Sequence, residues 1–221
     1  MDRYNRQIIT IGKDAQKKLL KSHICIVGVG ALGTAVAQSL VRSGVGKIKI
    51  IDFDIVNLDN LQRQHIYTQK DVGKDKVKAA LKYLNDVNSE VKIEAIKDAI
   101  DETNLDLLKS DLVLDCTDNF ETSYVISDYC KKNKIPLIFG SAIRLEGYVF
   151  NQVSRGKTVR ELFRGVPTFE RCKDVGVMNT ITSLIGCVQA NEAIKILIGK
   201  DFEKKLLRFD LVNNELLKIK V

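Results

Sequence analysis

Three glycines near the start of the chain have the spacing of a phosphate-binding turn. Gly28, Gly30 and Gly33 follow the apolar run HICIV and open a stretch with apolar residues at helical spacing. Such glycines let the backbone approach a phosphate, although they also serve tight packing of a helix on a strand. Asp52 ends the next apolar run, where a carboxylate accepts hydrogen bonds from ribose hydroxyls. The pattern predicts an adenine-nucleotide site without specifying the nucleotide.

Basic and amide side chains follow Asp52 closely. Arg63 and Lys76 place two fixed positive charges near the turn, and Asn60 and Gln64 add polar groups. Two cations suit a triphosphate and a leaving pyrophosphate better than the diphosphate of a dinucleotide. Lys76 taken alone, among neighbouring lysines, would instead be assigned to a solvated helix face.

Acidic residues follow another apolar run, DLVLDC, at residues 111–116. Asp118 lies just past this expected strand, whereas Asp115 is still inside its apolar pattern and has a structural explanation. Open α/β sheets bind ligands at the carboxyl ends of their strands. Magnesium is commonly held by one or two carboxylates plus phosphate oxygens, so Asp118 alone is sufficient as the protein ligand.

The five cysteines form no disulfide framework and no CxxC zinc motif. Cys172 lies between Arg171 and Lys173 in a polar segment, and adjacent cations lower the pKa of a thiol. A reactive and an incidental role for Cys172 both remain open. The other four are expected in apolar core positions; they are Cys25, Cys116, Cys130 and Cys187.

The elements that would position these residues alternate as in a doubly wound protein. Strand, glycine turn, helix, strand and terminal acid form a βαβ unit, and the pattern then repeats. We expect an α/β fold with a Rossmann-like, mostly parallel sheet and antiparallel C-terminal strands. Helices are predicted over residues 14–22, 31–43, 71–88, 102–108, 124–133 and 176–199, with a surface loop over 154–174. Strands are predicted over 23–30, 46–52, 91–96, 111–116, 136–140 and 147–153, with a closing hairpin of 206–211 and 215–221.

Composition describes an ordinary globular chain. Of 221 residues, 45% are hydrophobic, and the formal net charge is +7. The basic residues are scattered rather than interleaved with aromatic ones, so no nucleic-acid partner is expected. No signal-like apolar run and no run of 18 apolar residues occurs, so we expect a cytoplasmic protein without a membrane span.

Seven segments together resemble the ThiF/MoeB/HesA superfamily, the relatives of ubiquitin-activating enzymes. They are RYNRQ (3–7), GVGALG (28–33), DFDIVNLDNLQRQ (52–64), VGKDKV (72–77), DCTDN (115–119), GSAIRLEG (140–147) and GVMNTITSLIGCVQANEAIKIL (176–197). The resemblance implies that MgATP binds and that the C-terminal glycine carboxylate of a small ubiquitin-like sulfur carrier is adenylated, with release of pyrophosphate. The nucleotide and catalytic positions of the family fall on Arg6, Asp52, Asn60, Arg63, Lys76 and Asp118.

The resemblance also implies partners. They are a carrier ending in Gly-Gly for thiamine or molybdopterin biosynthesis, a sulfur donor such as a cysteine desulfurase, and a second copy of the chain. In such a homodimer Arg6 would reach the ATP of the partner subunit, and Cys172 matches a position that bonds to the carrier in one branch. Many members carry two CxxC pairs that bind zinc; this sequence has neither, so no zinc site is expected.

We expect a single domain over residues 1–221. It has an N-terminal helix in about residues 1–22, a nucleotide-binding half in about 23–140 and a carrier-binding half in about 141–221. Three alternatives remain at this point: an NAD-dependent oxidoreductase on the same fold, a non-catalytic carrier-binding protein, and an enzyme that modifies a peptide or an RNA base. Binding of NAD in place of ATP would favour the first, and absence of ATP–pyrophosphate exchange would favour the second.

Overall fold

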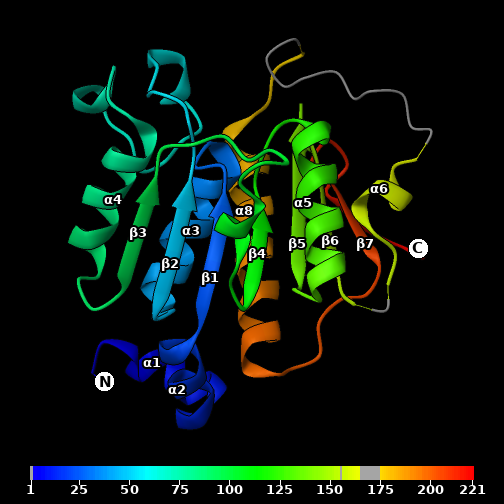
Figure 1. The fold of residues 1–221 in the computed structure, drawn as a ribbon, viewed down its shortest axis with the longest axis horizontal. Coiled ribbons are helices and arrows are strands. Elements are labelled where there is room, and N and C mark those ends of the chain that lie inside the picture. The colour runs from blue at the N-terminus through cyan, green and yellow to red at the C-terminus, as the bar shows by residue number, and fades with distance from the viewer. Residues whose placement is uncertain (1, 155, 165–174) are drawn as a thin grey trace.

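An eight-stranded mixed sheet runs through the molecule in the order β3-β2-β1-β4-β5-β6-β7-β8 (Figure 1). The computed structural model describes residues 2–154, 156–164 and 175–221. Neighbouring strands from β3 to β5 are parallel, and those from β5 to β8 are antiparallel, which confirms the predicted class. The strands are β1 His23–Val27, β2 Lys47–Ile51, β3 Lys92–Ile96, β4 Leu112–Asp115, β5 Leu137–Ile143, β6 Glu146–Gln152, β7 Leu206–Asp210 and β8 Glu215–Ile219.

Helices cover both faces of the sheet and enclose two apolar cores. One core lies under α3, α4 and α8, and the other lies under α5, α6 and the 3-10 turn η4. The helices are α1 Asn5–Ile11, α2 Lys13–Lys21, α3 Ala31–Ser43, α4 Lys76–Val87, α5 Phe120–Asn133, α6 Val159–Leu162 and α8 Asn179–Ile198. The 3-10 turns are η1 Asp2–Tyr4, η2 Leu58–Asn60, η3 Gln69–Asp71 and η4 Leu105–Leu108.

Strand β1 is buried on both sides, which explains its continuous apolar sequence. Ile24 and Ile26 belong to one core, and Cys25 and Val27 belong to the other. The chain leaves β1 toward β2 on one side, while β4 pairs with β1 on the other side. This reversal of strand order opens a crevice at the carboxyl ends of β1 and β4, where the glycine turn and the DCTDN segment begin.

Several elements differ from the sequence-based expectation: α5 begins at Phe120 rather than residue 124, α8 begins at Asn179 rather than residue 176, and only the 3-10 turn η4 forms within 102–108. Helix α4 begins at Lys76 rather than residue 71, because the preceding residues pair with the segment after β2. Ile55 and Asp75 form an antiparallel bridge, and the Val56 amide donates to the Lys74 carbonyl at 2.8 Å. Strand β5 continues to Ile143 and turns directly into β6, so the predicted strand over 136–140 is three residues too short at its end.

The expected N-terminal helix is divided, and the expected surface loop contains a helix. Gly12, with φ +89°, ends α1 and begins α2, because glycine tolerates this left-handed value. Within the loop predicted over 154–174, a capping box of Thr158 and Glu161 starts the short α6. Residues 155 and 165–174 of that loop lie outside the described part of the chain.

Helix α8 has no separate polar and apolar faces, and its buried residues include Gln189 and Glu192 as well as Ile181 and Ile185. Among the described helices it alone has the length and hydropathy of a membrane span, and half of its most apolar window is buried in the fold. It lies against α3 and against strands β4, β5 and β6. These properties are those of a core helix.

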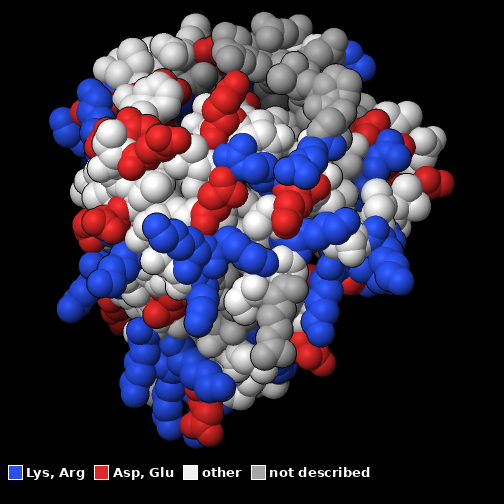
Figure 2. Space-filling view, turned by 45° about the vertical axis from the view of Figure 1, so that its right-hand side comes forward, with Lys and Arg blue, Asp and Glu red and all other residues white. Residues whose placement is uncertain are grey.

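Positive charge gathers at one end of the molecule. Figure 2 shows basic side chains massed at the lower end of the view, where Figure 1 places α1 and α2. Helix α2 contributes Lys13, Lys17, Lys18 and Lys21. This end is opposite the carboxyl ends of the parallel strands, so these lysines lie far from the crevice.

Candidate functional site

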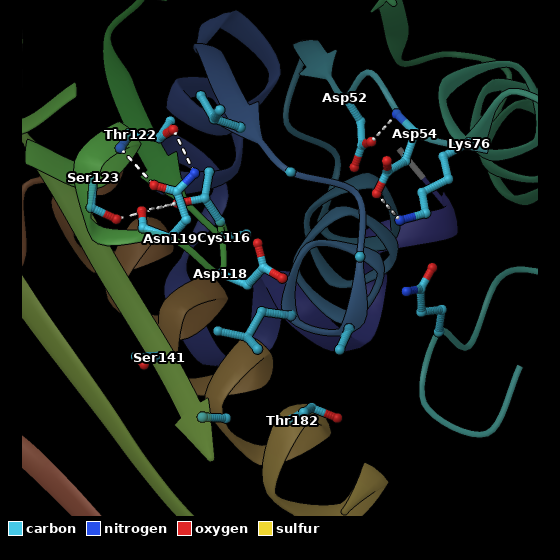
Figure 3. Close-up of a pocket in the computed structure, with 18 of the residues that line it drawn as sticks. Asp52, Asp54, Lys76, Cys116, Asp118, Asn119, Thr122, Ser123, Ser141 and Thr182 are labelled. Carbon is cyan, nitrogen blue, oxygen red and sulfur yellow. Dashed lines mark hydrogen bonds and ion pairs between the residues drawn. The ribbon is translucent and has the colours of Figure 1, made fainter. Parts of the chain in front are cut away.

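A cavity of about 280 Å³ lies at the carboxyl ends of β1 and β4 (Figure 3). Its walls come from the glycine turn, the ends of β2 and β5, the segment after β2 and the start of α5. The cavity brings together eight residues that the sequence singled out, which are Gly28, Gly30, Asp52, Asn60, Arg63, Gln64, Lys76 and Asp118. Residues of both expected halves of the chain line it, so a single site spans the two.

The three glycines divide into two roles. Gly28 has φ +87°, and a Cβ there would lie 2.7 Å from the Cys116 carbonyl oxygen. A Cβ on Gly33 would lie 1.9 Å from the Gly28 carbonyl oxygen, so these two glycines allow close backbone packing. A Cβ on Gly30 would meet nothing closer than Gln64 Nε2 at 3.8 Å. Gly30, which precedes α3, therefore leaves open space for a ligand at a helix N-terminus.

Asp52 is fixed by two backbone amides. The Val29 amide donates to Oδ2 at 2.7 Å, and the Asp54 amide donates to Oδ1 at 2.8 Å. Asp52 is 8% exposed and lines the cavity. Each carboxylate oxygen keeps further acceptor capacity, which a pair of ribose hydroxyls could use.

The segment after β2 supplies Asn60, Arg63 and Gln64. Asn60 Oδ1 accepts from the Asn57 amide in a capping box, which fixes η2. Arg63 Nη1 donates to the Asp59 carbonyl at 2.9 Å, so most of its donors stay available. Gln64 is 4% exposed, and its Oε1 has no hydrogen-bond partner among the described residues. A buried amide oxygen without a partner is suited to meet a donor on a ligand.

Lys76 is not part of a solvated helix face. Its side chain is 7% exposed, against 53% for Lys74 and 76% for Lys78. Lys76 Nζ lies 2.9 Å from Asp54 Oδ2. As the first residue of α4, Lys76 thus presents a buried ammonium group to the cavity.

The turn after β4 holds Asp118 between two anchored neighbours. Asp115 is fully buried, and its Oδ1 accepts from Thr117 N at 3.0 Å and Thr117 Oγ1 at 2.7 Å. Burial raises the pKa of the Asp115 carboxyl. Asn119 Oδ1 caps α5 by accepting from the Thr122 amide at 3.0 Å. Asp118 is exposed and accepts no hydrogen bond from any described residue, so its carboxylate is free to hold a cation in the cavity (Figure 3).

The structure does not bring Arg6 to this cavity. Arg6 is exposed on α1, at the end of the molecule opposite the carboxyl ends of the strands. Cys172 lies outside the described residues, so its predicted reactivity stays a prediction. The expected absence of zinc also stays a prediction.

The prediction that Cys187 is buried is wrong. Cys25, Cys116 and Cys130 are buried as expected, but Cys187 is exposed. Helix α8 packs through Ile185, Gly186 and Gln189, which leaves position 187 on its outward face. The exposed face of α8 could not be predicted from the sequence, because no stripe of polar residues runs along it.

Sequence reasoning missed several cavity residues. They are Phe53, Asp54, Asp98, Phe120, Phe139, Ser141, Tyr148 and Thr182. Asp54 stands in the quoted segment 52–64, and its alternation with Asp52 was an available signal. Phe53, Ser141 and Thr182 also stand in quoted segments, whereas Asp98, Phe120, Phe139 and Tyr148 reach the cavity through sheet topology, which their local sequence does not encode.

Comparison with known proteins places this arrangement in a family. The profile of the ThiF family matches residues 4–221, and the chain belongs to that family. It is 40% identical over 230 residues to the molybdopterin-synthase adenylyltransferase of Haemophilus influenzae, covering 99% of this chain and 94% of that protein. It is 35% identical over 222 residues to the SAMP-activating enzyme E1 of Haloferax volcanii, covering 96% and 82%.

Solved structures show the same fold. The crystal structure of Escherichia coli MccB with ATP superposes with a TM-score of 0.87 at 20% identity, over 100% of this chain and 71% of that one. Another MccB structure, with MccA-N7isoASN, has a TM-score of 0.88 at 21% identity, over 99% of this chain and 72% of that one.

Proposed function

We propose that the protein is an MgATP-dependent adenylyltransferase that activates the C-terminal glycine carboxylate of a small ubiquitin-like sulfur carrier. The observation that carries the proposal is the cavity itself. Gly30 leaves open space at the start of α3, where phosphates would bind, and Arg63, Lys76 and Asp118 line the same cavity. The names of the two curated relatives support the same reaction class.

The proposed reaction joins two anions. A carboxylate oxygen of the carrier attacks the α-phosphorus of ATP, and the bond from that phosphorus to the bridging oxygen of pyrophosphate breaks. The products are a carrier acyl-adenylate and pyrophosphate. Arg63 and Lys76 neutralise charge on the phosphates, and Asp52 holds the ribose so that the α-phosphorus stays in line.

The charges of the cavity fit a divalent cation. Asp52, Asp54, Asp98 and Asp118 face only two cations among the described lining residues, Arg63 and Lys76. A polyphosphate would therefore enter an acidic site unless it brought positive charge with it. Asp118 would hold magnesium together with phosphate oxygens. The ion supplies charge neutralisation of the phosphates when bound.

The proposed reaction also requires other protein chains. We propose a homodimer in which Arg6 serves the partner's site, and a separate sulfur donor, such as a cysteine desulfurase, that displaces AMP from the activated carrier. The pathway is thiamine or molybdopterin biosynthesis in the cytoplasm, and Cys172 is a candidate for a covalent bond to the carrier. The 40% identity to a molybdopterin-synthase adenylyltransferase supports molybdopterin biosynthesis.

Isotope exchange between ATP and labelled pyrophosphate tests the proposal. Exchange should appear only when magnesium and a carrier ending in Gly-Gly are both present, and a carrier lacking its last glycine should give none. Binding of NAD without exchange would support an oxidoreductase instead. Carrier binding without exchange would indicate a non-catalytic protein. Exchange that depends on a peptide or an RNA would show that this molecule, and not a carrier protein, is the substrate.

A further inference from the structure

Asp54 lines the cavity and holds the lysine that the proposed reaction assigns to the phosphates. Lys76 Nζ lies 2.9 Å from Asp54 Oδ2, and the Lys76 amide donates to the Asp54 carbonyl oxygen at 3.0 Å. The lysine side chain is 7% exposed, whereas the Asp54 side chain is 49% exposed. The ammonium group is thus buried, and its anionic partner sits at the open side of the pair.

The backbone fixes this pair in place. Asp54 follows Asp52 in the chain, and its amide donates to Asp52 Oδ1 at 2.8 Å. The bridge between Ile55 and Asp75 joins the two segments one residue further on. Figure 3 shows Asp54 directed at Lys76 beside Asp52. Asp54 therefore connects the expected ribose-binding acid with the expected phosphate-binding lysine.

A buried ammonium group needs an anion in every state of the protein. Removing the partner of a buried ion leaves an uncompensated charge, which is strongly unfavourable. Among the described residues, Asp54 is the ion-pair partner of Lys76 in the ligand-free protein. A phosphate group arriving at Lys76 would compete with Asp54 for the same ammonium group.

We propose that Asp54 is a positioning residue that acts as an exchangeable counter-ion for Lys76. Before ATP binds, Asp54 pairs with Lys76 and directs its side chain along the cavity wall. When a phosphate binds, Lys76 turns from Asp54 to the phosphate, and when pyrophosphate leaves, Lys76 returns to Asp54. The carboxylate thereby weakens phosphate binding and speeds product release. This inference rests on the proposed function, because that function places phosphates at Lys76.

Asp98 offers a matched control for the loss of one negative charge. It lines the same cavity, but its oxygens accept from the Ala99 amide at 2.9 Å and from Asn104 Nδ2 at 3.2 Å. It makes no ion pair with Lys76 in the described structure. Asp98→Asn therefore changes the charge of the cavity without freeing the lysine.

Calorimetric titration of the full chain with magnesium pyrophosphate and with MgATP tests the inference. Asp54→Asn should tighten pyrophosphate binding roughly tenfold, because Lys76 no longer has a competing anion. Stopped-flow displacement should show slower pyrophosphate release from the same variant. Asp98→Asn removes the same negative charge without freeing Lys76, so it should tighten binding much less than Asp54→Asn does. In a Lys76→Ala background, Asp54→Asn should have no further effect.

The sign of the effect separates this role from a structural one. If Asp54 only maintained the fold of the cavity, Asp54→Asn would weaken both ligands, and that result would overturn the inference. Unchanged affinity, equal tightening by Asp98→Asn, or tightening that persists in the Lys76→Ala background would also overturn it. If the unaltered protein bound neither ATP nor pyrophosphate, the proposed function itself would fail, and the inference with it.

Discussion

Two carboxylates only three residues apart have opposite surroundings. Asp115 ends β4 inside the protein and holds Thr117, whereas Asp118 is exposed at the cavity and accepts no hydrogen bond from a described residue. The first carboxylate shapes the turn, and the second is left for a ligand. This contrast supports the proposal that Asp118, and not its neighbour, holds the metal ion.

Asp118→Ala and Asp118→Asn should both lower carrier-dependent ATP–pyrophosphate exchange at least about a hundredfold, because each removes the charge that would hold the cation. Both proteins should remain folded, since Asp118 contributes no hydrogen bond to the described structure. Circular dichroism and thermal unfolding check the fold. Near-normal exchange in either variant would exclude Asp118 from the mechanism.

The cysteines allow a test of burial in solution. Burial raises the pKa of Cys25 to about 12 and also raises the pKa of Cys116 and Cys130, so these thiols stay protonated near neutral pH. Cys187 is exposed. Brief alkylation of the folded protein, followed by peptide mapping, should therefore label Cys187 well before the three buried cysteines, and unfolding should abolish the difference.

The same experiment compares Cys172 with Cys187. We expect Cys172 to react faster, because it alone has two adjacent cations. Equal or slower labelling of Cys172 would contradict its special reactivity. Cys172→Ser should leave ATP–pyrophosphate exchange intact and impair only a later step, the formation of a covalent adduct or of the thiocarboxylate.

Among the elements of the fold, the glycine turn has one glycine needed for packing, Gly33, and one that leaves space for a ligand, Gly30. Gly33→Ala should destabilise the protein by more than about 2 kcal/mol, because the added methyl group overlaps the Gly28 carbonyl and pushes α3 from the turn. Ordinarily alanine stabilises a helix position relative to glycine. Gly30→Ala should cost only about 1 kcal/mol, as expected at an N-cap, yet weaken ATP binding. Chemical denaturation and calorimetric titration measure the two effects. Equal stability of the two variants would contradict this division.

Periodicity predicted most elements of the sheet and its helices. The apolar run of β1 and the glycine turn before α3 are local signals, and both lie where the sequence placed them. The start of α4 could not be found in this way, because residues 73–75 pair with a segment some twenty residues earlier. The break at Gly12 was missed for a different reason, since a single glycine need not end a helix.

Local sequence patterns predicted several of the residues that line the cavity, but they did not predict which residues these side chains contact. Asp52, Arg63 and Lys76 lie on its wall, but the ion pair of Lys76 with Asp54 depends on that long-range pairing. The exposure of Cys187 likewise depends on which face of α8 meets α3. Both features depend on tertiary packing, so they could not be predicted from local sequence patterns alone.

At the scale of the whole molecule, Arg6 and the cavity lie at opposite ends of the sheet. Helix α1 sits beside the amino ends of the strands, whereas the cavity opens at their carboxyl ends (Figure 1). Arg6 is exposed there, and it is not among the residues that line the cavity. A role for Arg6 in catalysis therefore requires a second copy of the chain.

Mixing inactive variants tests that requirement. Arg6→Ala and Lys76→Ala proteins should each be inactive, and a mixture should regain part of the exchange activity. One of the two sites in a mixed dimer would contain Lys76 from one subunit and Arg6 from the other. Native mass spectrometry verifies that subunits have exchanged. If mixed dimers form and stay inactive, Arg6 does not act across the interface.

In the proposed reaction the carrier carboxylate, and no water molecule, attacks the α-phosphorus in this cavity. A carrier labelled with ¹⁸O in its C-terminal carboxylate tests the claim directly, with sulfide supplied to displace AMP. Because the oxygen that bonds to phosphorus leaves with AMP, mass spectrometry should find one labelled carrier oxygen in each AMP formed from a fully labelled carrier. AMP without carrier oxygen would show that ATP is cleaved by another route, and the carrier carboxylate would then not be the nucleophile.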